Sequence, residues 1–128
     1  MEDYYFLVKW KEEIVGILAR INDTYYTRFQ TKDLHDQKMA DEIIKQTAFV
    51  PNVLYKDSKL FEFFMRRIKP NPGEDVFTRM QKTGAKRPTD NFSLQEMTSE
   101  QAQYCKGVIE EALELEAKNR RNNFQARG

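Results

Sequence analysis

The sequence offers few side chains of the types and spacing that catalysis needs. His35 is the only histidine and Cys105 the only cysteine. They could act as a base and a nucleophile if the fold brought them together. An exposed loop histidine and a core cysteine are the more ordinary interpretation, because free cysteines are among the most buried residues. One His and one Cys cannot supply the ligand cluster of a structural zinc site.

Two acidic pairs, Glu12–Glu13 and Asp41–Glu42, are the other candidates for acid and base chemistry. The first pair falls in a predicted turn and the second on a predicted helix face, where solvated surface is the simpler interpretation. The five glycines are scattered along the chain, so there is no glycine-rich phosphate-binding loop. The sequence therefore predicts a protein that is not an enzyme and requires no cofactor or metal.

The stretch "LFEFFMRRIKP" at residues 60–70 has the composition of a binding surface. Its apolar residues extend beyond the arc of about 100° that a half-buried helix needs. The main stripe comprises Leu60, Phe61, Phe64 and Ile68. Phe63 lies off this stripe, beside Arg66 and Arg67, and aromatic and Arg side chains are enriched in interfaces. Phe63, Arg66, Arg67 and the nearby Lys59 are therefore candidate partner-binding residues, unless the fold covers both sides of the helix.

A second aromatic group raises the alternative of a nucleic-acid-binding regulator. Tyr25, Tyr26 and Phe29 lie on one predicted strand and could stack on bases, with Arg20 and Arg28 nearby. The alternative is that these rings serve the core. A nucleic-acid interface would require Tyr25 and Tyr26 to be exposed on a continuous basic surface.

These candidates must be positioned by a mixture of strands and helices. Runs rich in aromatic and β-branched residues predict strands at residues 4–10, 14–21 and 24–29. Gly16 marks a bulge or a close approach of two backbones, and Asn22–Asp23 is a turn signal. Such short connections predict an antiparallel meander.

Three helices are expected before the C-terminal one. The first covers residues 32–46. The second begins at a cap on Asp57 or Ser58 and ends near residue 69, and the third covers 74–83 with Gly84 as the stop. The segment 47–55 should be extended, and 92–97 could form a short strand. Thr98 and Gln101 match a capping box. The helix that follows has an apolar stripe of Cys105, Val108, Ile109, Ala112 and Leu115. The predicted fold is α+β, a small antiparallel β-meander sheet with helices packed on it and an extra C-terminal helix.

Length and charge limit the remaining possibilities. The 128 residues fit one domain, which we place at 1–117 with a frayed basic tail at 118–128. A net charge of +1 gives no global attraction to nucleic acid or membranes. The lone cysteine and the lack of a signal pattern or membrane-spanning apolar run predict a cytoplasmic, soluble protein.

The charges are unevenly distributed along the chain. Residues 54–90 contain nine Lys/Arg and five Asp/Glu, whereas residues 91–117 contain one Lys and six Glu. These regions could attract each other within the fold or in an oligomer, or they could be two solvated faces. Self-association through the helix after Thr98 is therefore a further alternative.

The order of these features resembles the N-terminal subdomain of HipA-type proteins, the serine/threonine kinase toxins of bacterial toxin–antitoxin systems. The resemblance covers roughly residues 4–95. It rests on "IVGIL" at 14–18 in the second strand, "TYYTRFQ" in the third, "AFVPN" at 48–52, "LFEFFMRRIKP" at 60–70, and then "DVFTRMQKTG" and "PTDNFSL". The kinase core of the family is absent, so the chain is similar to a stand-alone copy of this subdomain.

The resemblance implies a specific role. In three-gene systems of this family, a separately encoded protein of this kind binds the kinase and neutralises it, while a helix–turn–helix protein from the same operon binds DNA. The expected partner is then a HipA-like kinase that lacks its own N-terminal domain. The expected function is that of a non-catalytic antitoxin or accessory subunit.

Overall fold

The computed structural model describes residues 3–11, 13–30, 37–68, 72–84 and 92–126. The chain divides into two compact units, residues 1–97 and residues 98–128. Within the described residues, the first unit contains a sheet and three helices, and the second contains the single helix α4 (Ser99–Ala126).

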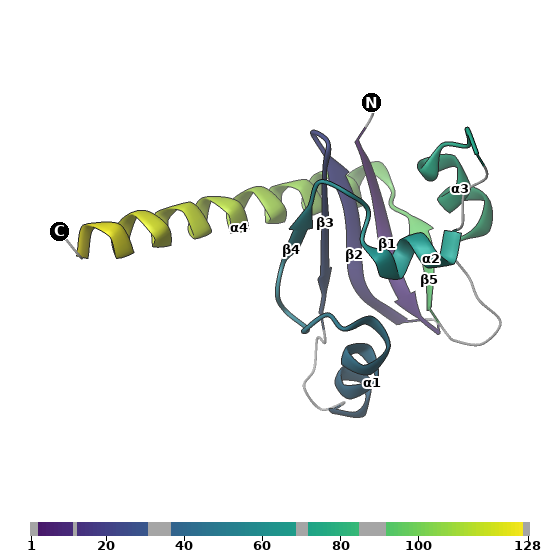
Figure 1. Ribbon diagram of the computed structural model, residues 1–128, viewed down its shortest axis with the longest axis horizontal. Helices are drawn as coiled ribbons and strands as arrows, with labels where there is room; N and C mark the ends of the chain where they lie inside the picture. Colours follow the sequence, from purple (N-terminus) through teal and green to yellow (C-terminus); the bar gives the residue numbers. More distant parts are fainter. Residues whose placement is uncertain (1–2, 12, 31–36, 69–71, 85–91, 127–128) are drawn as a thin grey trace. The chain divides into compact units, whose positions relative to one another are not determined.

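Five strands of the described residues form one antiparallel sheet in the first unit (Figure 1). They are β1 (Tyr4–Trp10), β2 (Glu13–Ile21), β3 (Thr24–Phe29), β4 (Tyr55–Asp57) and β5 (Phe92–Glu96). Their order across the sheet is β4-β3-β2-β1-β5, so β1, β2 and β3 form a meander and the two short strands flank it. The α+β fold predicted from the sequence is confirmed.

Side chains along the meander alternate between its two faces, so one set of side chains points into the core. Phe6 lies opposite Leu18, and Val8 lies opposite Gly16. The turn between β2 and β3 uses Asn22 and Asp23 with φ values of 50° and 65°, a conformation that Asn and Asp tolerate better than most residues. The predicted turn at this position is therefore confirmed.

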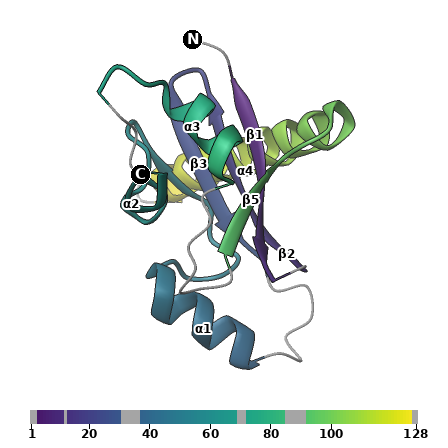
Figure 2. The same cartoon turned by 90° about the vertical axis from the view of Figure 1, so that its right-hand side faces the viewer.

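The helices α1 (Gln37–Thr47), α2 (Glu62–Ile68) and α3 (Val76–Thr83) contribute to a single core. Each provides at least one fully buried side chain, namely Ile43, Phe64 and Met80. These pack with sheet residues that include Phe6, Val8, Leu18, Phe29 and Leu94. The view in Figure 2, read with Figure 1, shows α2 over one face of the sheet and α1 towards one end of the strands.

The helix α2 begins later than the sequence predicted. Tyr55–Asp57 pairs with β3 as strand β4, and the Asp57 carboxylate accepts a hydrogen bond from the Lys59 amide at 3.2 Å, within a bend. The expected cap at Asp57 or Ser58 is therefore wrong, because the residues before Leu60 complete the sheet edge. The expected end near Lys69 lies outside the described residues.

The segment between α1 and β4 is also less extended than predicted. Ala48 and Asn52 have φ values of 64° and 67°, which reverse the chain direction locally. The Asn52 amide donates a hydrogen bond to the carbonyl of Phe29 at the end of β3. The predicted end of α1 is close to the observed Thr47, whereas its expected start at residue 32 lies outside the described residues.

The helix α3 begins at Val76, slightly after the expected start at residue 74, and ends where the sequence predicted. Asp75 caps the helix by accepting a hydrogen bond from the Thr78 amide at 3.2 Å. Gly84 ends the helix with a left-handed φ of 60°, as predicted. The predicted strand near residue 92 is β5, which pairs with β1.

The second unit begins with the predicted capping box. The Gln101 amide donates to the Thr98 hydroxyl at 3.3 Å, and the Thr98 amide donates to the Gln101 side chain at 3.0 Å. Of the apolar stripe, Cys105 and Ile109 are buried, and Leu115 is 60% exposed. The helix is continuous through Ala126, and so includes most of the segment 118–128 that the sequence assigned to a tail.

Candidate protein-binding site

The helix α2 is fixed by side chains on its core side. Phe64 and Ile68 are each 1% exposed, and Leu60 just before the helix is 7% exposed. Burial of such side chains contributes about 1.5–3 kcal/mol each. Phe61 is half-buried against the same core. The main stripe predicted from the sequence is therefore the face by which α2 attaches to its unit.

Phe63 is less exposed than the sequence predicted. Its ring meets the ring of Phe64 edge-to-face at a centroid distance of 5.1 Å and that of Phe92 at 5.5 Å. It is half-buried, because β5 covers one side of it. The wide apolar arc of α2 is thus partly explained by two internal contacts, one with the core beneath the helix and one with the edge strand beside it.

The two arginines of α2 have different environments. The Arg67 guanidinium lies 4.5 Å from the ring centroid of Phe63 and 5.5 Å from that of Phe92, within the range of a cation–π interaction. Arg66 is exposed, and its Nε lies 3.2 Å from a carboxylate oxygen of Glu62 one turn earlier. Arg67 is thus partly held by aromatic rings, whereas Arg66 extends into solvent.

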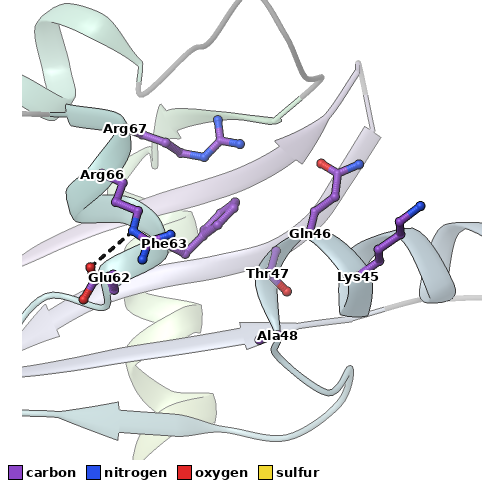
Figure 3. A pocket seen from close by; sticks show the side chains of 8 residues that line it. All are labelled: Lys45, Gln46, Thr47, Ala48, Glu62, Phe63, Arg66 and Arg67. Atoms are coloured by element: carbon purple, nitrogen blue, oxygen red, sulfur yellow. Dashed lines mark hydrogen bonds and ion pairs between the residues drawn. The ribbon is translucent and has the colours of Figure 1, made fainter.

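A pocket of about 460 Å³ lies between α2 and the C-terminal end of α1. Its lining comprises Lys45, Gln46, Thr47, Ala48, Glu62, Phe63, Arg66 and Arg67. Figure 3 shows Phe63 between the two helices, with Arg66 and Arg67 on one side and Lys45 and Gln46 on the other. The described residues of the pocket therefore combine an aromatic ring, three basic groups and one acid.

The rim contributed by α1 is well defined. Thr47 is buried, and its hydroxyl donates to the Ile43 carbonyl at 2.5 Å and accepts from the Phe49 amide at 3.0 Å. These bonds close the last turn of α1 and direct the chain away from the helix. The exposed Lys45 and Gln46 project from that turn at the pocket.

The structure brings together three of the four residues expected to bind a partner. Phe63, Arg66 and Arg67 line the pocket, whereas Lys59 is exposed in the bend before α2 and does not line it. Sequence reasoning missed Lys45 and Glu62. The i, i+4 spacing of Glu62 and Arg66 could have indicated their pairing, but no local pattern connects Lys45 to α2.

The residues considered for nucleic-acid binding do not form an exposed stacking surface. Tyr25 and Tyr26 are adjacent on β3 and so point to opposite faces of the sheet. Tyr26 is 9% exposed, Phe29 is fully buried, and Tyr25 packs against the core. Arg20 is also buried and pairs with Asp23 at 2.6 Å. The exposure that this alternative required is therefore not observed.

The candidates for catalysis are not assembled among the described residues. Burial raises the pKa of the Cys105 thiol to about 11, so the thiol is neutral near pH 7. His35 and Glu12 lie outside the described residues. Glu13 and Asp41 are exposed, and Glu42 is half-buried on α1.

Among the described residues, no three His, Cys, Asp or Glu side chains gather where they could hold a metal ion. In the same part of the chain, no helix has the length and apolar character needed to cross a bilayer. Comparisons with protein-family models, with curated proteins and with solved structures found no match.

Proposed function

We propose that this chain is a non-catalytic protein-binding module, the antitoxin or accessory subunit of a HipA-type serine/threonine kinase. The partner would be a kinase that lacks its own N-terminal domain. The module would act in the cytoplasm, where the kinase and any helix–turn–helix protein of the same operon would be found.

The observation that carries this proposal is the pocket beside α2. It combines Phe63, a half-buried aromatic ring, with Arg66 and Arg67 on the same helix. Aromatic and Arg side chains are enriched at protein interfaces and among their hot spots. The contacts of Phe63 with Phe64 and Phe92, and of Arg67 with Phe63 and Phe92, lower the entropy cost of holding these two side chains in place on association.

The proposed mechanism is steric. The core side of α2 holds the helix on its own sheet, while the pocket side would contact the body of the kinase. Docking there would block either the active conformation of the kinase or access of its substrate. This mechanism needs no nucleophile, base or metal from the module.

The proposal is tested by adding the module to such a kinase and measuring both affinity and phosphorylation rate. Arg66→Ala should leave the melting temperature nearly unchanged, because the Arg66–Glu62 pair is exposed. It should weaken binding by about 2 kcal/mol if Arg66 is an interface hot spot. Lys82→Ala, on the exposed side of α3, is the matched control and should bind normally.

Phe63→Ala extends the same test. Because Phe63 packs on Phe64 and Phe92, this variant should lose some stability as well as affinity, unlike Arg66→Ala. If Phe63→Ala loses stability but both variants bind the kinase normally, the partner surface lies elsewhere.

Self-association is a second candidate function, and exposed residues on α4 favour it. Tyr104 is 77% exposed and Leu115 is 60% exposed. A second copy of the chain that packed along α4 would cover both side chains. Sedimentation of the purified chain over a range of concentrations distinguishes this candidate, which requires a concentration-dependent increase in mass.

A further inference from the structure

The pocket between α1 and α2 has an excess of positive charge. Lys45 is provided by α1, and Arg66 and Arg67 are provided by α2. Among the described residues of the lining, Glu62 is the acidic one. At neutral pH this gives three cationic groups for one carboxylate, so the pocket should attract an anion.

Glu62 indicates which kind of anion fits. Its carboxylate already lies 3.2 Å from Arg66 Nε, at a wall of the pocket. Both side chains are exposed, at 69% for Arg66 and 76% for Glu62. An ion pair this exposed is worth only about 0–1 kcal/mol, so a second carboxylate can replace Glu62 at Arg66 at little cost.

The end of α1 disfavours a doubly charged anion such as phosphate. Lys45, Thr47 and Ala48 place the C-terminal end of this helix at the pocket. A helix C-terminus carries about half a negative charge, whereas phosphate sites are characteristic of helix N-termini. Together with Glu62, this end would repel a phosphate dianion more strongly than a single carboxylate.

Arg67 and Phe63 give the site a fixed shape. The guanidinium of Arg67 stacks against Phe63 and Phe92 at 4.5 and 5.5 Å. Phe63 is in turn held by Phe64. Because this wall is ordered by internal contacts, an incoming side chain does not have to immobilise it.

We propose that this pocket binds a Glu or Asp side chain from an acidic segment of a protein partner, and that this carboxylate displaces Glu62 from Arg66. The inference rests on the proposed function only in that the partner is a protein. It adds that the partner segment is acidic, and that Glu62 occupies Arg66 until the partner's carboxylate replaces it.

The test is a titration of the full-length protein with a hexaglutamate peptide bearing a neutral fluorophore, followed by anisotropy. Hexaglutamine is the peptide control. Arg66→Gln and Lys45→Gln should each raise the Kd by about tenfold, the effect of losing one charge-assisted contact. Glu62→Gln should lower the Kd by about threefold, because it removes the competing carboxylate. Melting temperatures show whether each variant remains folded.

Two further variants control for net charge. Lys82→Gln and Glu13→Gln make the same charge changes at exposed residues that do not line the pocket. Both should bind hexaglutamate like the parent protein. If they shift the Kd as much as the pocket variants do, the attraction is a general charge effect and the proposal is wrong.

Other outcomes would overturn the proposal in defined ways. Equal binding of hexaglutamine would exclude carboxylate recognition, and stronger competition by inorganic phosphate than by acetate would indicate a phosphate site. A dimer that dissociates in Arg66→Gln would assign the pocket to a second copy of this chain. Kinase binding that survives Arg66→Gln and Lys45→Gln would reject both this inference and docking of the kinase at this pocket. Kinase binding that is weakened by these variants, without any binding of hexaglutamate, would reject this inference alone. Hexaglutamate binding without kinase binding would reject only the proposed function.

Discussion

At the scale of single residues, Gly16 shows how closely the sheet is packed. A Cβ at this position would lie 2.6 Å from the carbonyl oxygen of Arg28 and 3.1 Å from the Cα of Phe29. Both neighbours are backbone atoms of β3, which cannot turn aside as a flexible side chain can. The sequence signal of a glycine within a strand is therefore explained by a close approach of two backbones.

Gly16→Ala should consequently destabilise the protein by about 1–3 kcal/mol, the usual cost of overpacking. Gly107→Ala is the matched control, because nothing lies within 4 Å of the position that its added methyl group would take. That change should stabilise α4 by about 0.5–1 kcal/mol. Urea unfolding of both variants measures the two effects, and a neutral Gly16→Ala would contradict the described β2–β3 pairing.

Cys105 is a second residue whose environment makes a measurable difference. Burial raises the pKa of its thiol from 9.0 to about 11. The native thiol should therefore alkylate more slowly than the unfolded thiol at pH 9, with a rate that rises towards pH 11. Iodoacetamide labelling in buffer and in urea measures both rates, and equal rates would show that the thiol is not buried.

The same shift predicts a pH dependence of stability. The unfolded chain ionises Cys105 at a lower pH than the folded protein does. The neutral buried thiol therefore favours folding below pH 9, and this contribution is lost as the pH rises to about 11. Unfolding free energies of the parent protein and Cys105→Ala should converge or cross over this range, and a constant difference between them would contradict the prediction.

At the scale of elements, the sequence was most informative where the composition or an end signal is distinctive. The three long strands are rich in aromatic and β-branched residues, and a glycine ends α3, so these elements could be predicted. Strand β4 has only three residues, too few to show a period of two. Its pairing with β3 delays the start of α2 to Glu62.

The candidate site was predictable only in part, for a related reason. Phe63, Arg66 and Arg67 fall within about one turn of a single helix, so their proximity follows from helical spacing. Lys45 reaches the same pocket from α1, which is a tertiary contact that no local pattern encodes. The half-burial of Phe63 depends likewise on Phe92, which lies far along the chain on β5.

The helix α4 allows a test of its apolar stripe. Ile109 is 1% exposed, whereas Leu115 on the same helix is 60% exposed. Ile109→Ala should cost about 2–5 kcal/mol by leaving a cavity, and Leu115→Ala should cost less than about 1 kcal/mol. Denaturant unfolding compares the two, and similar small losses would mean that Ile109 is not buried in solution.

At the scale of the whole molecule, charge is separated along the chain. The pocket with its excess of basic groups belongs to the first unit. The second unit carries an acidic stretch with Glu110, Glu111 and Glu114 exposed on α4. The net charge of +1 is therefore the sum of a basic pocket in the first unit, an acidic stretch on α4 and the remaining charges of the chain. Such a distribution favours recognition of particular partners over general attraction to polyanions.

Docking of the pocket beside α2 on a HipA-type kinase is the step on which the proposed function depends. Its sharpest test is calorimetric titration of the full chain into a kinase of this type that is encoded next to it and lacks an N-terminal domain. We expect stoichiometric binding with a Kd of about 1 μM or tighter, weakened by Arg66→Ala and unchanged by Lys82→Ala. The absence of such a kinase, no heat of binding, or equal affinity of all three proteins would contradict this proposal.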